Sequence, residues 1–149
     1  MRLVKTDSHN ATFKTLVKEL DAYLAVTDGD EHSFYNQFNK LDHINHVIIA
    51  FIGDVAVGCG AIKEYNPQSM EIKRMYTKKE YRSHGIASRI LNELEQWAID
   101  LSYKRCILET GVNQREAIVL YRKNHYLLID NYGQYVNMEN SFCFEKKLS

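Results

Sequence analysis

The sequence has little proline, no excess of charge of either sign and no long apolar run. One proline and 7 glycines in 149 residues exclude a collagen-like or low-complexity chain. The 19 Lys and Arg residues balance 19 Asp and Glu residues, so no overall field attracts nucleic acid or an anionic membrane. No segment reaches the roughly 20 apolar residues of a membrane span, and the first residues lack the apolar region of a secretory signal. We therefore expect a cytoplasmic protein without a nucleic-acid or membrane partner.

Cysteine pairs and metal-binding motifs are also missing. Cys59, Cys106 and Cys143 are far apart, have no C-x-x-C spacing and lie in apolar or β-rich runs. No Cys and His residues stand at the spacing of a metal site, so we expect buried, reduced thiols and no metal. The composition, 45% hydrophobic and 26% charged, is that of a globular chain with a core. Without a linker or repeat, residues 1–149 are expected to form one domain.

The first half of the chain predicts two helices and four strands. Between Phe13 and Leu24, apolar residues recur at helical spacing, with Ser8 or Asn10 as a possible cap. Residues 32–41 fit a second, weaker helix. Strands are expected at residues 2–6, on both sides of the Gly53-Asp54 turn within residues 46–65, and at residues 70–77.

The second half predicts a strand-helix-strand unit, a further helix and two closing strands. One apolar stripe defines the long helix, made of Ile86, Ile90, Leu94, Trp97, Ala98 and Leu101. A strand at residues 104–110 and a helix at residues 113–124 follow, and then strands at residues 126–129 and 141–148. The inward-facing candidates of the second helix are Ala117, Ile118, Leu120 and Tyr121. A crossover helix of this length joins parallel strands, whose ligands bind beyond their carboxyl ends, here residues 76–87 and 110–113.

The loop "EYRSHGIASRIL", residues 80–91, places one glycine at the start of the long helix. Unpaired backbone N–H groups and the positive end of the helix dipole make such a start suited to an anion, and a plain helix entry with solvated basic residues is the alternative. Neither the G-x-x-x-x-G-K-[ST] phosphate loop nor the G-x-G-x-x-G dinucleotide fingerprint is present. The loop instead contains R-x-x-G-x-A, from Arg82 to Ala87.

This motif, between a strand and a helix, resembles the acyl-CoA-binding signature of the GCN5-related N-acetyltransferase (GNAT) superfamily. The elements from Met70 to Lys147, including the "LY-x-x-x-x-Y" segment, follow the order of that superfamily. The resemblance implies a mixed α/β fold, with a twisted, mostly antiparallel sheet, a splayed parallel strand pair at its centre and helices on both faces. Ser83 and His125 stand where relatives often have Gly, and His tolerates the left-handed conformation of a helix end better than most residues.

The resemblance also implies acetyl-CoA as co-substrate and names the residues that hold it. The pantetheine arm would pair like an added strand with the backbone of Met75, Tyr76 and Thr77. Asn113 is a candidate to bind the pantetheine amide and is equally suited to cap the last helix. Backbone amides of the loop would hold the pyrophosphate, through Arg82, Ser83, His84, Gly85, Ile86 and Ala87. In this family the Arg82 position acts mainly through its backbone.

Transfer of an acetyl group from a thioester to an amine requires two proton movements. The alkylammonium, with a pKa of about 10, must lose a proton, and the leaving thiolate, with a pKa of about 8.5, should gain one. Tyr121 occupies the position where the superfamily commonly places the acid that protonates the coenzyme A thiolate. Glu71 stands eleven positions before Arg82, as does the catalytic glutamate of histone-acetylating relatives, and Glu109 ends the next strand. Either glutamate is a candidate base, or the ion-pair partner of Arg74, Lys73 or Arg105.

These features predict an N-acetyltransferase that acts on a primary amine by direct attack in a ternary complex. A backbone N–H of Met75 or Tyr76, exposed by a strand bulge, would stabilise the oxyanion. The acceptor pocket is expected from the first two helices and residues 131–141, whose aromatic residues are candidates to line it: Phe34, Tyr35, Phe38, Tyr132 and Tyr135.

Several alternatives remain open for the acceptor and the activity. A small-molecule amine is favoured over a protein amino group, because the sequence has no acidic tract for a basic peptide tail. An acyl-CoA-binding regulatory domain without turnover is the rival of another class. A nucleotide-phosphate-binding module is disfavoured by the missing Lys-Ser/Thr pair. The aromatic-rich C-terminal part makes a homodimer a further expectation.

Overall fold

Residues 1–28 and 43–148, which the computed structural model describes, form one seven-stranded sheet with helices on both faces. The strands are β1 (Arg2–Thr6), β2 (His46–Ile52), β3 (Val55–Asn66), β4 (Ser69–Thr77), β5 (Arg105–Gly111), β6 (Leu127–Ile129) and β7 (Ser141–Lys147). The helices are α1 (Ala11–Asp28), α3 (Ile86–Asp100) and α4 (Arg115–Lys123), with short 3-10 turns at Lys79–Tyr81 and Gly133–Tyr135. The helix expected at residues 32–41 lies outside the described residues.

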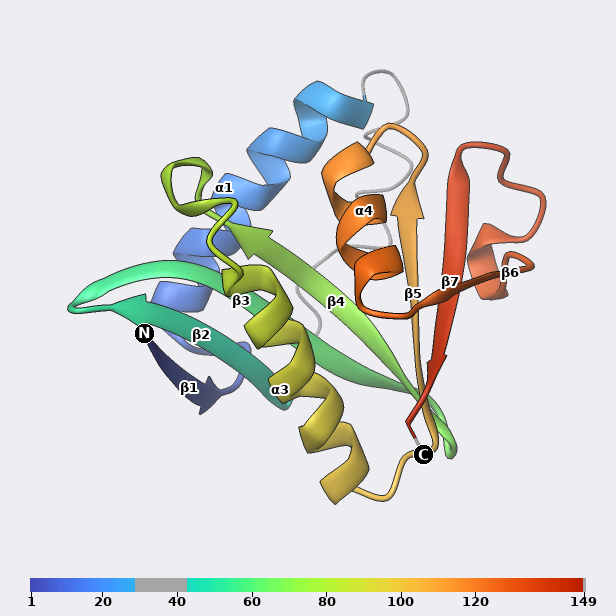
Figure 1. The fold of residues 1–149 in the computed structure, drawn as a ribbon, viewed down its shortest axis with the longest axis horizontal. Coiled ribbons are helices and arrows are strands. Elements are labelled where there is room, and N and C mark those ends of the chain that lie inside the picture. The colour runs from blue at the N-terminus through green and yellow to red at the C-terminus, as the bar shows by residue number, and fades with distance from the viewer. Residues whose placement is uncertain (29–42, 149) are drawn as a thin grey trace.

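The sheet has the order β1-β2-β3-β4-β5-β7-β6, and β4 with β5 is its parallel pair. All other neighbours run antiparallel. The expected mixed α/β fold is therefore confirmed. Parallel pairing joins only residues 69–71 of β4 to residues 105–107 of β5, and the strands diverge beyond these pairs (Figure 1). The carboxyl ends of both strands thus lie on either side of an opening in the middle of the sheet.

Two apolar clusters hold the helices to opposite faces of the sheet. Helices α3 and α4 lie on one face and α1 lies on the other (Figure 1). On the α3 face, Ile90 and Leu94 pack with Ile72 and other buried residues, and most of the predicted α3 stripe is buried. Leu101 is the exception, because it follows the last turn of α3 and is 40% exposed. On the α1 face, Phe13, Leu16 and Val17 pack against β2 and β3.

The start of α1 resolves the choice between its two predicted caps. The side-chain Oδ1 of Asn10 accepts a hydrogen bond of 3.0 Å from the backbone N–H of Phe13, which is the usual contact of an N-cap residue. Ser8 does not cap the helix. Its hydroxyl accepts a hydrogen bond of 2.8 Å from the backbone N–H of Ile44. Asn10 therefore caps the helix, and Ser8 ties its entry to the segment before β2.

Strand β4 contains a bulge that changes the direction of its side chains. The pairing with β3 shifts between Cys59 and Ala61, and on β4 the extra residue lies at Arg74, whose φ is 59°. Gly60 lies opposite the bulge, where a Cβ atom would stand 2.5 Å from the Met75 sulfur and 2.9 Å from Leu94. Only glycine fits there without displacing its neighbours. The bulge confirms the irregular strand that was expected beside the oxyanion position.

The three cysteines are free and fully buried, as the sequence predicted: Cys59, Cys106 and Cys143. Burial raises the pKa of the Cys59 and Cys106 thiols to about 12. Within residues 1–28 and 43–148, no helix is long and apolar enough to cross a membrane. The same residues contain no cluster of three or more His, Cys, Asp or Glu side chains placed to hold a metal ion.

Candidate active site

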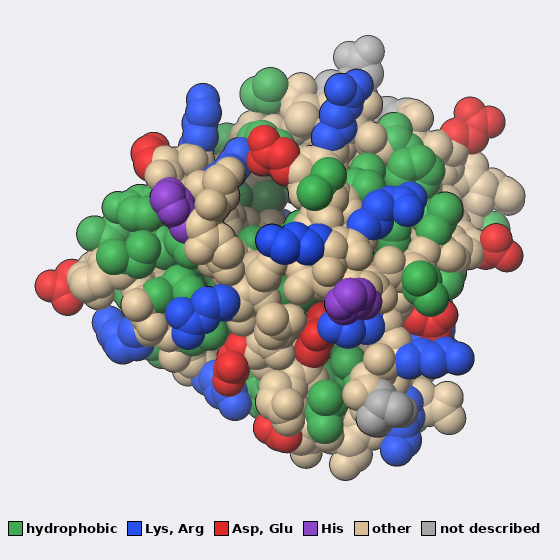
Figure 2. Space-filling view, viewed as in Figure 1, with side chains coloured by type: hydrophobic (Ala, Val, Ile, Leu, Met, Phe, Trp, Pro, Cys, Tyr) green, Lys and Arg blue, Asp and Glu red, His purple; other side chains and the backbone are tan. Residues whose placement is uncertain are grey.

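A cavity of about 660 Å³ occupies the opening between β4 and β5. Its walls come from both faces of the sheet, with Tyr23 and Leu24 of α1 on one side and Ile86, Leu120 and Tyr121 on the side of α3 and α4. Space-filling Figure 2 shows a hollow on the α3 and α4 face, with Lys and Arg side chains beside it. Because one cavity passes through the sheet, two ligands entering from opposite faces could meet inside it.

The loop before α3 presents free backbone N–H groups to this cavity. Gly85 is the N-cap of α3 in a left-handed conformation, with φ of 78° and no side-chain cap, and Ser83 is also left-handed, with φ of 68°. The first helical hydrogen bond runs from Arg89 to Gly85, so the amides of residues 86–88 have no acceptor within the helix. A Cβ atom on Gly85 would meet nothing within 4 Å, so φ alone requires glycine. The loop has the geometry of an anion-binding helix start.

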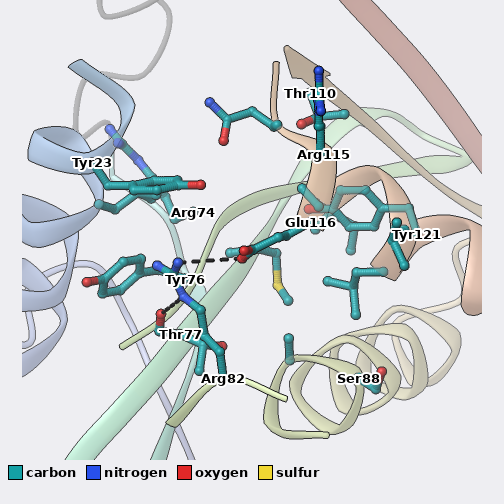
Figure 3. Close-up of a pocket in the computed structure, with 18 of the residues that line it drawn as sticks. Tyr23, Arg74, Tyr76, Thr77, Arg82, Ser88, Thr110, Arg115, Glu116 and Tyr121 are labelled. Atoms are coloured by element: carbon teal, nitrogen blue, oxygen red, sulfur yellow. Dashed lines mark hydrogen bonds and ion pairs between the residues drawn. The ribbon is translucent and has the colours of Figure 1, made fainter. Parts of the chain in front are cut away.

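The end of β4 adds one further unsatisfied polar group. The hydroxyl of Thr77 is buried without a hydrogen-bond partner among the described residues. Its backbone carbonyl accepts a hydrogen bond of 2.9 Å from Nε of Arg82 (Figure 3). Since buried polar groups are normally hydrogen-bonded, the free hydroxyl beside the cavity indicates a place for a polar ligand group.

The side chain of Arg82 links three elements across the cavity. Its guanidinium donates to the Thr77 carbonyl, lies 3.5 Å from a carboxylate oxygen of Glu116 at the start of α4, and lies 5.0 Å from the ring centre of Tyr23 on α1 (Figure 3). The family resemblance emphasised the backbone of Arg82. The structure places its side chain on the cavity wall as well.

Tyr121 lies on the cavity wall and is 6% exposed. Its ring packs against the rings of Tyr126 and Phe144, at centre-to-centre distances of 5.8 and 6.3 Å. Burial raises the pKa of its phenol well above the usual value, and the negative charge of Glu109 raises it further. The hydroxyl therefore keeps its proton throughout the neutral pH range, as a proton donor must.

The two predicted glutamates lie on the same cavity wall. Glu71 is 8% exposed, and its Oε2 accepts a hydrogen bond of 2.5 Å from the Tyr132 hydroxyl, while Lys73 Nζ lies 3.8 Å from Oε1. Burial, then the charges of Glu109 and Glu71, raise the pKa of the Tyr135 phenol. Glu71, Glu109 and Tyr135 thus lie on one cavity wall. Of the aromatic residues expected to line an acceptor pocket, Tyr135 lies on the wall, Tyr132 does not, and Phe34, Tyr35 and Phe38 lie outside the described residues.

The structure shows which ion pairs Lys73, Arg74 and Arg105 form. Among the described residues, Lys73 pairs with Glu71, as one alternative suggested. Arg74 pairs instead with Asp21, at 3.0 Å, and Arg105 pairs with Glu145, also at 3.0 Å. Glu71 therefore has a structural partner and still lines the cavity.

Three predicted positions lie away from the cavity wall. His84 and Asn113 are exposed and do not line the cavity. Helix α4 begins one residue later than a cap at Asn113 would require, because Gln114 is its N-cap residue, so the capping interpretation of Asn113 is wrong. His125 adopts the expected left-handed conformation, with φ of 72°, and is exposed after the end of α4.

The sequence did not identify several other residues of the wall. Tyr23 and Leu24 follow Leu20 at helical spacing, so the helical pattern placed them on one face of α1 without indicating a cavity there. Gln114, Arg115 and Glu116 also line the cavity at the start of α4. Nothing in the sequence indicated that Arg74 lines the cavity, because the alternation of side chains along a regular strand would place its side chain on the opposite face of the sheet, away from α1.

Comparisons with known proteins agree with this geometry. Residues 13–126 match the model of the acetyltransferase (GNAT) family. The chain is 31% identical over 135 residues to an IAA acetyltransferase of Azospirillum brasilense, covering 89% of this chain and 88% of that protein. It is 33% identical over 101 residues to the uncharacterized N-acetyltransferase YsnE of Bacillus subtilis, covering 66% and 67%. The chain therefore belongs to the GNAT family and is an acetyltransferase.

Solved structures show the same fold. A Klebsiella pneumoniae structure described as an acyl-CoA N-acyltransferase superposes with a TM-score of 0.83, at 25% identity, over 99% of this chain and 97% of that chain. A GNAT family acetyltransferase of Elizabethkingia anophelis with acetyl-CoA bound superposes with a TM-score of 0.64, at 15% identity, over 83% and 87%. The second likeness concerns the fold alone.

Proposed function

We propose that the chain transfers the acetyl group of acetyl-CoA to a primary amine of a small molecule, by direct attack in a ternary complex. The observation that carries this proposal is the single cavity through the sheet. It has Tyr121 on its wall together with Glu71 and Glu109, so a proton donor and two proton acceptors share one space. Acyl transfer to an amine needs these two kinds of group on either side of the reacting carbon.

The polar groups around the cavity fit acetyl-CoA. Amides of residues 86–88 and the left-handed loop suit the pyrophosphate, because they offer donors without an acceptor. The edge of β4 from Met75 to Thr77 has no strand partner on the β5 side, and the free Thr77 hydroxyl lies beside it. An extended pantetheine arm would pair with that edge, and Arg82 would have to release the Thr77 carbonyl or share it. The Elizabethkingia acetyltransferase, which has the same fold, holds acetyl-CoA.

Bound acetyl-CoA supplies an acetyl group activated as a thioester. Tyr121 holds a proton at its hydroxyl and donates it to the leaving sulfur. The pair Glu71 and Glu109 accepts the proton that the substrate ammonium loses. A backbone N–H of Met75 or Tyr76, beside the bulge, stabilises the charge on the acetyl oxygen.

Direct transfer is favoured over a covalent acyl-enzyme because the cysteines are badly placed for nucleophilic attack. None of the three thiols lines the cavity, and all three are fully buried. Burial raises the pKa of Cys59 and Cys106 to about 12, so these thiols carry almost no thiolate at neutral pH.

The experiment that tests this function combines binding and turnover. Acetyl-CoA at about 100 times its Kd should stabilise the protein by about 2.7 kcal/mol and raise its Tm accordingly. A panel of primary amines should then accelerate thiol release from acetyl-CoA. Binding without amine-stimulated release would support a regulatory domain instead, and absence of binding would contradict the co-substrate.

The matched glycine variants Gly85→Ala and Gly53→Ala locate the binding site. Both glycines have positive φ, 78° and 59°, and an added Cβ would meet nothing within 4 Å at either position. Both substitutions should therefore cost a similar free energy of unfolding, about 1 kcal/mol. We expect only Gly85→Ala to weaken acetyl-CoA binding. Equal affinity of the two variants would place the pyrophosphate elsewhere.

A further inference from the structure

Arg74 is a buried cation that a backbone bulge turns toward the cavity and α1. Its side chain is 3% exposed and lines the cavity, and its φ is 59°. In a regular strand residue 74 would follow Met70 and Ile72 onto the α3 face, where both belong to the core cluster. A non-glycine residue in a left-handed conformation persists only where its surroundings require it, and such residues concentrate at ligand sites.

Asp21 of α1 engages only part of the Arg74 guanidinium. Nη1 of Arg74 donates to Oδ1 of Asp21 at 3.0 Å, and the Asp21 side chain is 36% exposed. A guanidinium carries five N–H donors in a planar fork, and this contact uses one of them. Within residues 1–28 and 43–148, no other carboxylate pairs with Arg74, so part of the fork is available to a carboxylate that enters the cavity.

Negative charge lies farther along the same strand. Glu71 and Glu109 line the cavity from β4 and β5, and both act on the phenol of Tyr135, which lines it from the loop before β7. Lys73 also lines the cavity and lies 3.8 Å from Glu71, so it offsets part of this negative charge. Two carboxylates near Tyr135 and the Arg74 cation near α1 still give the acceptor half of the cavity two regions of opposite charge. Such an arrangement suits a ligand with an ammonium group at one end and a carboxylate at the other.

The distance between the charged groups and the apolar part of the cavity wall restrict the class of ligand further. Glu71 and Arg74 are three residues apart on β4, and because the strand bulges at Arg74 their backbone positions are separated by at most about 10 Å, the length of three extended residues at roughly 3.3 Å each. Two charge-assisted hydrogen bonds of about 2.8 Å with an α-amino acid between them span a comparable length. The wall beside Arg74 is apolar and aromatic, because Leu20, Tyr23 and Leu24 of α1 form it (Figure 3 shows Tyr23 next to Arg74).

From these relationships we infer that the acetyl acceptor is an α-amino acid with an apolar or aromatic side chain, whose carboxylate binds Arg74. The inference rests on the proposed function. The reaction is the same one: the amine nitrogen bonds to the acetyl carbon as the carbon–sulfur bond breaks, Glu71 or Glu109 accepts the amine proton, and Tyr121 gives its proton to sulfur. The products are an N-acetylamino acid and coenzyme A.

The test compares each amino acid with the amine that lacks only its carboxylate. L-Phenylalanine is paired with phenethylamine and L-leucine with isopentylamine, and thiol release from acetyl-CoA gives kcat/KM for each. We expect the amino acid of each pair to be favoured by about tenfold or more, because one charge-assisted contact separates the two. The preference should disappear in Arg74→Gln and persist in Arg105→Gln, which loses an ion pair of the same 3.0 Å length outside the cavity.

A measurement on the unmodified protein covers the case in which Arg74→Gln does not fold. Hydrocinnamate, which has the carboxylate and ring but no amine, should inhibit competitively against the best amine of the panel, and neutral hydrocinnamamide should not. Equal inhibition by both compounds, or equal rates for the two members of each pair, would overturn the amino-acid inference and leave the proposed function intact. If acetyl-CoA binds but no amine stimulates thiol release, the proposed function fails, and the inference fails with it.

Discussion

The hydroxyl of Tyr132 donates a hydrogen bond of 2.5 Å to Oε2 of Glu71, across 61 residues of sequence. The bond joins the loop before β7 to the point where β4 leaves β5, and it sets the direction of a carboxylate that lines the cavity. Burial, and then the charge of Glu71, raise the pKa of the Tyr132 phenol, so the donor keeps its proton.

Removal of this hydroxyl in Tyr132→Phe should lower the free energy of unfolding by about 1.5–3 kcal/mol, because a buried carboxylate loses a charge-assisted bond. Denaturant titration measures the change. Tyr103→Phe is the matched control, since the Tyr103 hydroxyl donates a bond of the same 2.5 Å to Glu64 at an exposed site. It should cost less than about 1 kcal/mol. Equal losses in the two variants would contradict the role of burial.

Substitution of each glutamate should show which one acts as the base. We expect Glu71→Gln or Glu109→Gln to lower kcat by about a hundredfold or more, with little change in acetyl-CoA affinity, because general base catalysis contributes about 10²–10⁴-fold. Steady-state kinetics with the best amine, together with a Tm check of folding, separates the two. The prediction is wrong if both variants retain the rate of the unmodified protein.

Tyr121→Phe removes the proposed acid without changing the shape of the side chain. We expect kcat to fall by about a hundredfold and the KM for acetyl-CoA to change little. Because the Tyr121 pKa lies above its usual value, the phenol stays protonated as pH rises to about 10, the ordinary value for Tyr. A pH profile of kcat should therefore show no decline from this group below that pH. A Tyr121→Phe enzyme of full activity would assign the proton donation to another group.

His125→Gly should stabilise the protein by up to about 1 kcal/mol. His125 is exposed and has φ of 72°, a conformation that costs a residue with a Cβ free energy and suits glycine at a helix end. Thermal unfolding measures the gain, and His125→Ala serves as control because alanine keeps the strain. Activity should not change, because His125 is exposed and does not line the cavity. A His125→Gly variant no more stable than the unmodified protein would contradict the strain at this position.

The buried thiols predict a loss of stability at high pH. The folded pKa of Cys59 and Cys106 is raised from 9.0 to about 12, so the folded state binds their protons more tightly than the unfolded state does. This stability is fully present below pH 9 and is lost as pH rises from about 9 to about 12. Urea titrations at pH 8 and pH 10.5 should show a lower midpoint at the higher pH. At pH 8, a thiol reagent should react with the folded protein far more slowly than with the unfolded chain.

Much of the fold could be predicted because local patterns encode it. The Gly53-Asp54 turn, the α3 stripe from Ile86 and the strand-helix-strand unit all rest on side-chain periodicity and backbone preference, which act over a few residues. Two predictions failed because a helix boundary lies one residue away from the predicted one. Leu101 is exposed because α3 ends at Asp100, and Asn113 does not cap α4 because the helix begins one residue later.

The candidate site also has parts that the sequence predicted and parts that it did not. Motif position selected the loop at Arg82 to Ala87, Tyr121 and Glu71 as candidates, and its place at the end of a strand selected Glu109. The loop could be predicted because a helix start with free amides is a local property of the chain. The sequence by itself determined the family, the order of elements and the glycine-containing loop that opens α3. The tertiary structure decided that Tyr132 holds Glu71, that Tyr23 faces the cavity and that the bulge turns Arg74 toward α1. These contacts join distant segments, and their energies depend on packing across the sheet that no local pattern records.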